Sequence, residues 1–320
     1  MSKPKIALYW CSSCGGCEES VVDIAENVLT VRELADIVFW PVALDVKYKD
    51  VEAFADNEIA VTLINGSIRM DEQEHMAKLL RRKSQKIIAQ GACAHIGGIY
   101  GLANLNKKGE CLDKAYKEVP SVKNPKGVLP QVKTKDCGRE LELPDFHDTV
   151  RSLDQVITVD YYIPGCPPNP KYIVEAVLAV LGNKDLPFGY VFAERRSLCH
   201  SCHLVDSKPQ DSVINKIKRV HEWVWDPEKC FLAQDMICLG PATRGGCEER
   251  CIKGNMPCRG CYGPVENVED QGGKFLSALA SIINSNDEKQ LKKIAGSFPD
   301  IAGFCYRYSL PTSLLKKKVG

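Results

Sequence analysis

The sequence lacks the features that mark several special classes of protein. Its 320 residues carry 42 Lys and Arg against 41 Asp and Glu, so neither sign of charge is in excess to attract nucleic acid. No apolar run approaches the roughly 18 residues that a membrane helix requires. The first apolar run follows the N-terminus directly, without a basic and apolar leader. We therefore expect a cytoplasmic protein that binds neither nucleic acid nor a membrane.

Cysteine, in contrast, is unusually abundant. There are 16 cysteines, and eight of them lie within residues 199–261. A secreted disulfide framework would be short and preceded by a leader, whereas cytoplasmic thiols stay reduced and clustered cysteines more often bind metal. The cysteine content therefore predicts metal or cluster sites.

The N-terminal half alternates short runs rich in valine and isoleucine with helical patterns. Apolar residues at 21–28 predict one helix, Asp71 with Glu74 forms a capping-box pattern at the start of another, and Asn169-Pro170 suits the start of a third. This alternation predicts a doubly wound, mostly parallel α/β sheet. The expected strands are residues 5–10, 36–40, 59–64, 86–89 and 155–162.

Four cysteines follow three of these strands: Cys14 and Cys17 follow the first, Cys93 follows residues 86–89, and Cys166 follows residues 155–162. Ligands of such sheets bind outside the carboxyl ends of the strands, so the four thiols are expected at one edge. Each has a glycine beside it that permits a tight turn. The pattern favours a four-cysteine cluster site over isolated buried cysteines. Cys11 extends the first pair to C-x2-C-x2-C, and spacing alone leaves open which pair binds.

The eight cysteines of the C-terminal half suffice for two further four-cysteine sites. This half has few long apolar runs, so we expect metal ligation to replace much of its core. Zinc remains an alternative, although the scattered spacing favours iron–sulfur clusters. His200 and His203 could ligate or only donate hydrogen bonds to sulfide. The expected domains are residues 1–190, with a surface insertion at about 103–154, and residues 191–320.

Together these motifs resemble the small, electron-transferring subunit of nickel–iron hydrogenases, over most of the chain from residue 5 to about 264. Cys14-Gly-Gly-Cys17-Glu-Glu19 is similar to that family's C-x-G-C-x-E motif, which favours Cys14 and Cys17 over Cys11. The most similar group is the cytoplasmic methyl-viologen-reducing type, whose characteristic stretches stand here at residues 198–202, 239–244 and 257–264.

The resemblance implies a flavodoxin-like N-terminal domain, an irregular C-terminal iron–sulfur domain and three 4Fe–4S clusters. Many members have histidine where this chain has Cys199, and lack a counterpart of Cys251, so both cysteines imply all-cysteine 4Fe–4S clusters of lowered potential. The implied ligands are Cys14, Cys17, Cys93 and Cys166 for the proximal cluster, Cys247, Cys251, Cys258 and Cys261 for the medial cluster, and Cys199, Cys202, Cys230 and Cys238 for the distal cluster.

The implied function is electron relay from a nickel–iron large subunit to a 2Fe–2S subunit and a flavin-containing heterodisulfide reductase of methanogenesis. The chain would hold no catalytic centre of its own, although Glu19 could assist proton movement. The alternatives are a zinc-stabilised scaffold protein and a relay paired with a large subunit that lacks nickel. Four cysteines have no assigned role: Cys11, Cys111, Cys137 and Cys305.

Overall fold

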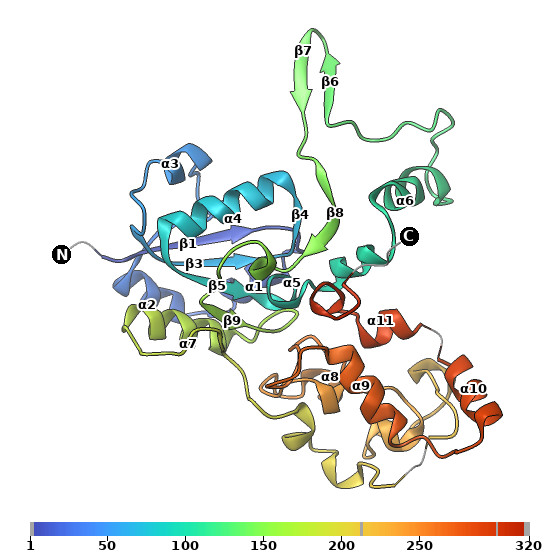
Figure 1. Cartoon of the computed structure of the whole chain (residues 1–320). Helices are drawn as coiled ribbons and strands as arrows, with labels where there is room; N and C mark the ends of the chain where they lie inside the picture. Colours follow the sequence, from blue (N-terminus) through green and yellow to red (C-terminus); the bar gives the residue numbers. More distant parts are fainter. Residues whose placement is uncertain (1–2, 212–213, 299, 317–320) are drawn as a thin grey trace.

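The computed structural model describes residues 3–211, 214–298 and 300–316, and its N-terminal half is built on one parallel sheet (Figure 1). The strand order is β10-β9-β5-β3-β1-β2, and every neighbouring pair is parallel. Leu8 lies opposite Leu63, which lies opposite Ile88. The strands are β1 (Lys5–Trp10), β2 (Asp36–Phe39), β3 (Ile59–Asn65), β5 (Ser84–Gln90), β9 (Tyr161–Ile163) and β10 (Tyr190–Val191).

Helices cover both faces of this sheet. Successive residues of a strand point to opposite faces, so apolar side chains on both faces need to be covered. Ile6 and Leu8 of β1 pack with one set of helices, while Ala7 and Tyr9 point to the opposite face. The first set is α1 (Gly16–Val22), α2 (Asn27–Leu34) and α7 (Pro170–Leu181). The second face is covered by α3 (Tyr48–Glu52), α4 (Asp71–Lys83) and α5 (Gly91–Ile96). The predicted parallel α/β sheet is therefore confirmed.

Two predicted elements are wrong in extent. Residues 155–162 are not one strand: a 3-10 turn covers Leu153–Gln155, and only Tyr161–Ile163 pairs in the sheet. Leu153, Ile157 and Val159 are buried by packing beside the sheet, so their apolar character reflects burial without pairing. The single helix expected over residues 21–28 is broken between α1 and α2, where Ala25 has a left-handed φ of 53°.

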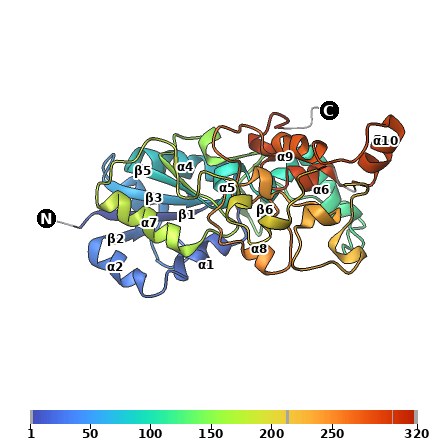
Figure 2. The same cartoon turned by 90° about the horizontal axis from the view of Figure 1, so that it is seen from below.

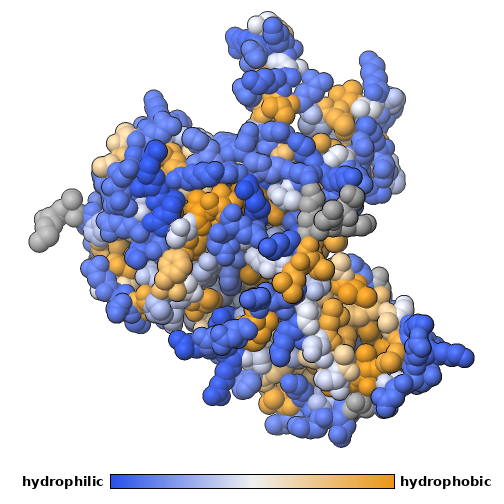
Figure 3. Space-filling view, viewed as in Figure 1, coloured by the Kyte–Doolittle hydropathy of each residue, from blue (hydrophilic) through white to orange (hydrophobic). Residues whose placement is uncertain are grey.

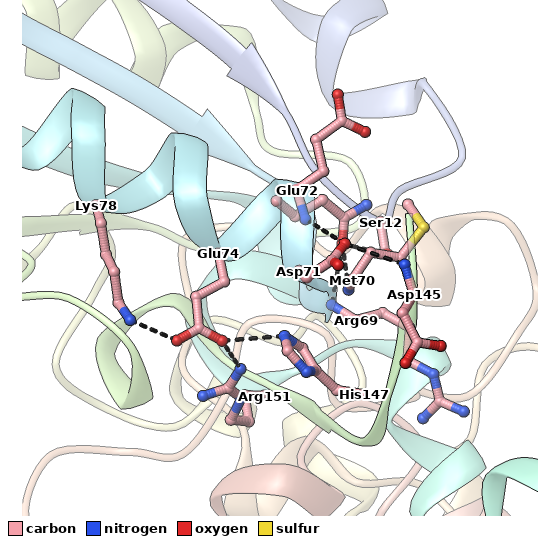
Figure 4. Close-up of polar contacts among 11 residues, drawn as sticks. Ser12, Arg69, Met70, Asp71, Glu72, Glu74, Lys78, Asp145, His147 and Arg151 are labelled. Carbon is pink, nitrogen blue, oxygen red and sulfur yellow. Dashed lines mark hydrogen bonds and ion pairs between the residues drawn. The ribbon is translucent and has the colours of Figure 1, made fainter. Parts of the chain in front are cut away.

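The start of α4 also differs from the expected capping box. Gln73, not Glu74, accepts hydrogen bonds from the backbone N–H groups of Arg69 (3.0 Å) and Met70 (3.1 Å). Glu74 instead contacts Lys78, Arg151 and His147 (Figure 4). The hydrogen bonds from Lys78 and Arg151 lower the pKa of Glu74 to about 2. Its carboxylate thereby joins α4 to the end of the insertion.

The insertion at residues 103–154 extends from the sheet domain, in agreement with its expected place on the surface (Figure 1). It contains α6 (Lys108–Asp113) and a hairpin of β6 (Lys133–Asp136) and β7 (Arg139–Glu142), whose residues are all exposed. Strand β8 (Phe146–Arg151) returns to pair antiparallel with β4 (Ile68–Met70). In Figure 3 apolar side chains gather near the base of this largely hydrophilic hairpin.

The C-terminal half lies beyond the end of the sheet to which β1 and β3 point (Figures 1 and 2). It has few regular elements, but it contains an apolar core in which single buried residues from many short segments meet. The sequence does not predict this core, because single residues in short segments form no long apolar run. Phe275 and Leu279 of α9 (Gln271–Ala280) and Ile294 of α10 (Glu288–Gly296) pack in this core. The remaining helices are α8 (Arg250–Lys253) and α11 (Ile301–Cys305).

Within residues 3–211, 214–298 and 300–316, no helix combines the length and the hydropathy that crossing a membrane requires.

Asp160 offers a test of how the sheet is held together. Its buried carboxylate accepts from Arg81 of α4 (2.6 Å) and from the backbone N–H of Ile87 in β5 (2.8 Å). Asp160→Ala should reduce the free energy of unfolding by about 3 kcal/mol, because it leaves the N–H of Ile87 without its acceptor and removes the anion that pairs with Arg81 and Lys86. Glu118→Ala, which removes only an exposed pair with Lys114, should cost under about 0.5 kcal/mol. Urea unfolding of the two variants measures this difference, and equal losses would contradict it.

Candidate metal-cluster sites

The first group of thiols lies where three parallel strands end. Cys14 and Cys17 stand at the turn into α1 after β1, Cys93 lies in α5 after β5, and Cys166 follows β9. Burial raises the pKa of the Cys17 thiol, and the thiols of Cys93, Cys166 and Cys14 raise it further. Burial, with Cys166 and Cys14, raises the pKa of Cys93 to about 12. The structure therefore brings together the four residues expected to share one site.

Two glycines leave the space that these sulfur atoms occupy. A Cβ at Gly91 would lie 2.4 Å from Cys17 Sγ, and a Cβ at Gly98 would lie 2.3 Å from Cys93 Sγ. Both glycines also have positive φ angles, 84° and 66°, which other residues rarely adopt. The backbone can approach the thiols this closely only because these positions carry no side chain.

Cys11 lies apart from this group, although the sequence places it three residues before Cys14. It is buried with Tyr9 and Phe39 beneath α4, and its backbone N–H donates to the carbonyl of Asn65 (2.8 Å). Burial alone raises the pKa of its thiol, with no contribution from another cysteine. Cys11 is therefore a residue of the apolar core and not a member of the first cysteine group.

The second group lines a cavity of about 290 Å³ in the C-terminal half. Burial raises the pKa of the Cys261 thiol, and Cys251, Cys166 and Cys247 raise it further. A single tetrahedral zinc ion draws four sulfur atoms to about 2.3 Å and leaves no space of this size. A wider iron–sulfur cluster fits the cavity better. The four cysteines of this group are Cys247, Cys251, Cys258 and Cys261.

The third group comes from residues 199–238, which precede the second group in the sequence, and consists of Cys199, Cys202, Cys230 and Cys238. Burial raises the pKa of Cys199 to about 11, with Cys230 and Cys202 adding to the shift and Lys208 opposing it. Gly240 again supplies space, because a Cβ there would lie 3.2 Å from Cys199 Sγ and 3.6 Å from Cys238 Sγ.

Contacts at cysteines connect the three groups in series. Cys166, in the first group, lines the cavity of the second group together with Cys261. The backbone N–H of Cys258, also in the second group, donates to Cys238 Sγ in the third (3.3 Å). Burial raises the pKa of the Cys166 thiol, and the Tyr308 hydroxyl opposes that effect. The second group therefore lies between the other two.

Glu249 is a site residue that the sequence reasoning missed. Its carboxylate is buried and accepts from the backbone N–H (2.9 Å) and from Nδ1 (2.7 Å) of His203. The ligand atoms of Cys202, His203 and Glu249 lie within 4.8 Å of one another. His203 thus faces a carboxylate, and His200 Nδ1 lies 3.2 Å from the hydroxyl of Ser197. In the sequence, the only indication of this residue is the acidic pair Glu248-Glu249 between Cys247 and Cys251.

Glu18, not Glu19, is the buried acid beside the first group. Its carboxylate accepts hydrogen bonds from Trp40 Nε1 and Asn65 Nδ2, and burial raises its pKa against those two hydrogen bonds. Glu19 lies exposed on α1. The remaining cysteines join no group: Cys111 is half-buried, Cys137 is exposed and Cys305 is buried in the C-terminal core.

Known proteins are similar to this chain in sequence and in fold. Residues 14–180 match the family model described as NADH ubiquinone oxidoreductase, 20 Kd subunit, and the chain therefore belongs to that family. The fold is similar to that of a [NiFeSe] hydrogenase structure from Desulfovibrio vulgaris Hildenborough, with a TM-score of 0.52 and 17% identity over 89% of this chain and 99% of that one.

More specifically, the chain belongs to the family of F420-non-reducing hydrogenase iron–sulfur subunits. It is 40% identical to the F420-non-reducing hydrogenase iron–sulfur subunit of Archaeoglobus profundus, over 98% of both chains. It is 36% identical to the corresponding F420-non-reducing hydrogenase subunit of Methanothermobacter thermautotrophicus, over 99% of this chain and 97% of that one. The family resemblance found in the sequence is confirmed, and members of the wider family bind iron–sulfur clusters.

Gly91 provides a direct test of the first group. Gly91→Ala should displace Cys17 and remove about four irons per chain, because the new Cβ occupies the place of the sulfur. Gly138→Ala is the matched control, since Gly138 also has a positive φ (75°) and a Cβ there has nothing within 4 Å. Iron analysis of the purified variants measures the effect, and an unchanged iron content in Gly91→Ala would contradict the assignment.

Proposed function

We propose that this chain is the electron-transfer subunit of a nickel–iron hydrogenase complex and holds three 4Fe–4S clusters. The proximal cluster would bind the first cysteine group, the medial cluster the second and the distal cluster the third. The observation that carries the proposal is the order of the groups: Cys166 of the first group lines the cavity of the second with Cys261, and the N–H of Cys258 in the second group donates to Cys238 Sγ in the third.

The proposed domains divide the clusters between them. Residues 1–190 would form the flavodoxin-like domain with the proximal cluster, and residues 191–320 the iron–sulfur domain with the medial and distal clusters. The separate apolar cores of the two halves support this division. The cavity of the second group supports a bound cluster in the C-terminal domain.

When bound, the clusters would accept and donate single electrons. The residues of this chain control the conditions for that transfer. Burial of Cys17, Cys238 and Cys258 excludes water from their sulfur atoms, and the backbone N–H of Cys258 donates a hydrogen bond to Cys238 Sγ. Such burial and hydrogen bonding tune cluster potentials. No bond of a substrate is broken on this chain.

The proposed partners are those of the hydrogenase family resemblance. A nickel–iron large subunit would split hydrogen beside the exposed Cys14, and a 2Fe–2S subunit would accept the electrons for a heterodisulfide reductase. The relatives from Archaeoglobus and Methanothermobacter, which are hydrogenase subunits by name, support the large-subunit partner. A cytoplasmic location is part of the same proposal.

The function is tested by purifying the native complex and assaying hydrogen-dependent viologen reduction together with nickel content. We expect both activity and nickel. A complex with iron but neither nickel nor activity would contradict the hydrogenase assignment and leave an electron relay. A colourless protein that contains zinc would contradict both and indicate a scaffold role.

Cys251 distinguishes a four-iron from a three-iron medial cluster. Cys251→Ala should leave that cluster with three cysteine ligands, so the EPR spectrum of the oxidised complex should gain a 3Fe–4S signal. Cys137→Ala removes an exposed hairpin thiol that joins no group and should leave the spectrum unchanged. Identical spectra for the two variants would show that Cys251 is not a ligand.

A further inference from the structure

A second cavity of the C-terminal half, of about 490 Å³, is lined by an excess of cationic side chains. We call it the basic cavity. Its basic residues come from separate segments, around residues 218–221, 259 and 307, and its lining contains one carboxylate. The charged and titratable residues are Lys218, Arg219, His221, Arg259, Arg307 and Asp300.

Most of this positive charge has no partner within the described part of the chain. There, no carboxylate forms an ion pair with Arg219, Arg259 or Arg307. The Asp300 carboxylate is already used, because it caps α11 by accepting from the backbone N–H of Gly303 (2.8 Å). Lys218 is paired with Asp235 (2.8 Å). Arg307 Nε also donates to the backbone carbonyl of Gly303 (3.1 Å), but that carbonyl carries no charge, so the charge of all three guanidinium groups is left for an anionic ligand to compensate.

Two of these guanidinium groups lie against one aromatic ring. The Arg259 and Arg307 guanidinium carbons are 5.3 and 5.8 Å from the centroid of Phe304. Both arginines also line the basic cavity, and an anion bound there would offset the repulsion between their like charges. Bidentate recognition of carboxylates is a common role of arginine.

The surroundings of the basic cavity favour a protein ligand over a small anion. Met256, which lines the cavity, is 40% exposed, and Val224, three residues after His221, is 94% exposed. Aromatic, methionine and arginine side chains together are typical of protein interfaces. An acidic segment with apolar residues would match both the charge and the exposed apolar side chains.

The basic cavity also lies beside the proposed electron path. Ile237 and Arg259 line it and adjoin Cys238 and Cys258 in the chain, the two residues whose hydrogen bond joins the second and third cysteine groups. A protein docked here would stand next to the proposed medial and distal clusters. A redox partner is therefore the occupant that best explains the position.

We propose that the basic cavity is the docking site for an acidic segment of the protein that accepts electrons from this chain, the 2Fe–2S subunit. The inference rests on the proposed function. Opposite charges on two partners accelerate their association and make binding depend on salt. The unpaired arginines would thus guide the acceptor to the distal end of the relay.

Arg219 is the residue of choice for the test, because it is exposed and its polar contacts in the described chain are hydrogen bonds between its backbone and Glu222. A complex that lacks the 2Fe–2S subunit would be titrated with that purified subunit. Arg219→Glu should weaken binding about tenfold at low ionic strength, and the difference should shrink at high salt. Arg219→Lys should bind like the unaltered complex.

Lys184→Glu is the matched control, because it makes the same charge change at an exposed site beside Pro4 and Glu58, near the amino ends of the strands. Equal affinities of Arg219→Glu and Lys184→Glu would overturn the proposal. Competition by inorganic phosphate beyond that of chloride at equal ionic strength would also overturn it, in favour of a small-anion site. Hydrogen-dependent viologen reduction should be unchanged in both variants, and its absence from the unaltered complex would instead refute the proposed function.

Discussion

Thiols packed close together in buried groups are the constraint on which the rest of this structure depends. Burial and neighbouring thiols together raise the pKa of Cys17, Cys93 and Cys261, so these groups resist ionisation until a cation compensates the thiolates. In the proposed function iron would supply that compensation, and its binding free energy would then stabilise the fold. The close approach of backbone to sulfur at Gly91 and Gly98 is a local consequence of the same constraint.

The parallel sheet positions one cysteine group, and the C-terminal half positions the other two. The first group lies at the ends of three strands that are distant in the sequence. The other two groups lie on turns that an apolar core holds in place. The two halves meet at a cysteine among other places, since Cys166, which follows β9, lines the cavity of the second group. This contact brings the first and second groups next to each other.

Much of the sheet and of the first group could be predicted, because strands β1, β3 and β5 are short apolar runs and parallel strands share a carboxyl edge. The short β9 could not be predicted, because residues 153–159 are apolar through packing alone. The grouping of the C-terminal cysteines followed only from family resemblance, since turns have no periodicity. Glu249 was missed because nothing in the sequence around the two acids shows that Glu249 is buried and Glu248 is exposed.

The central claim is that three four-cysteine groups hold three iron–sulfur clusters. Iron, sulfide and zinc analysis of the anaerobically purified complex, expressed per copy of this chain and corrected for its partners, tests that claim most directly. We predict about twelve irons and twelve sulfides, with no zinc, on this chain. About four irons, or about two zinc ions in the C-terminal half, would contradict the relay.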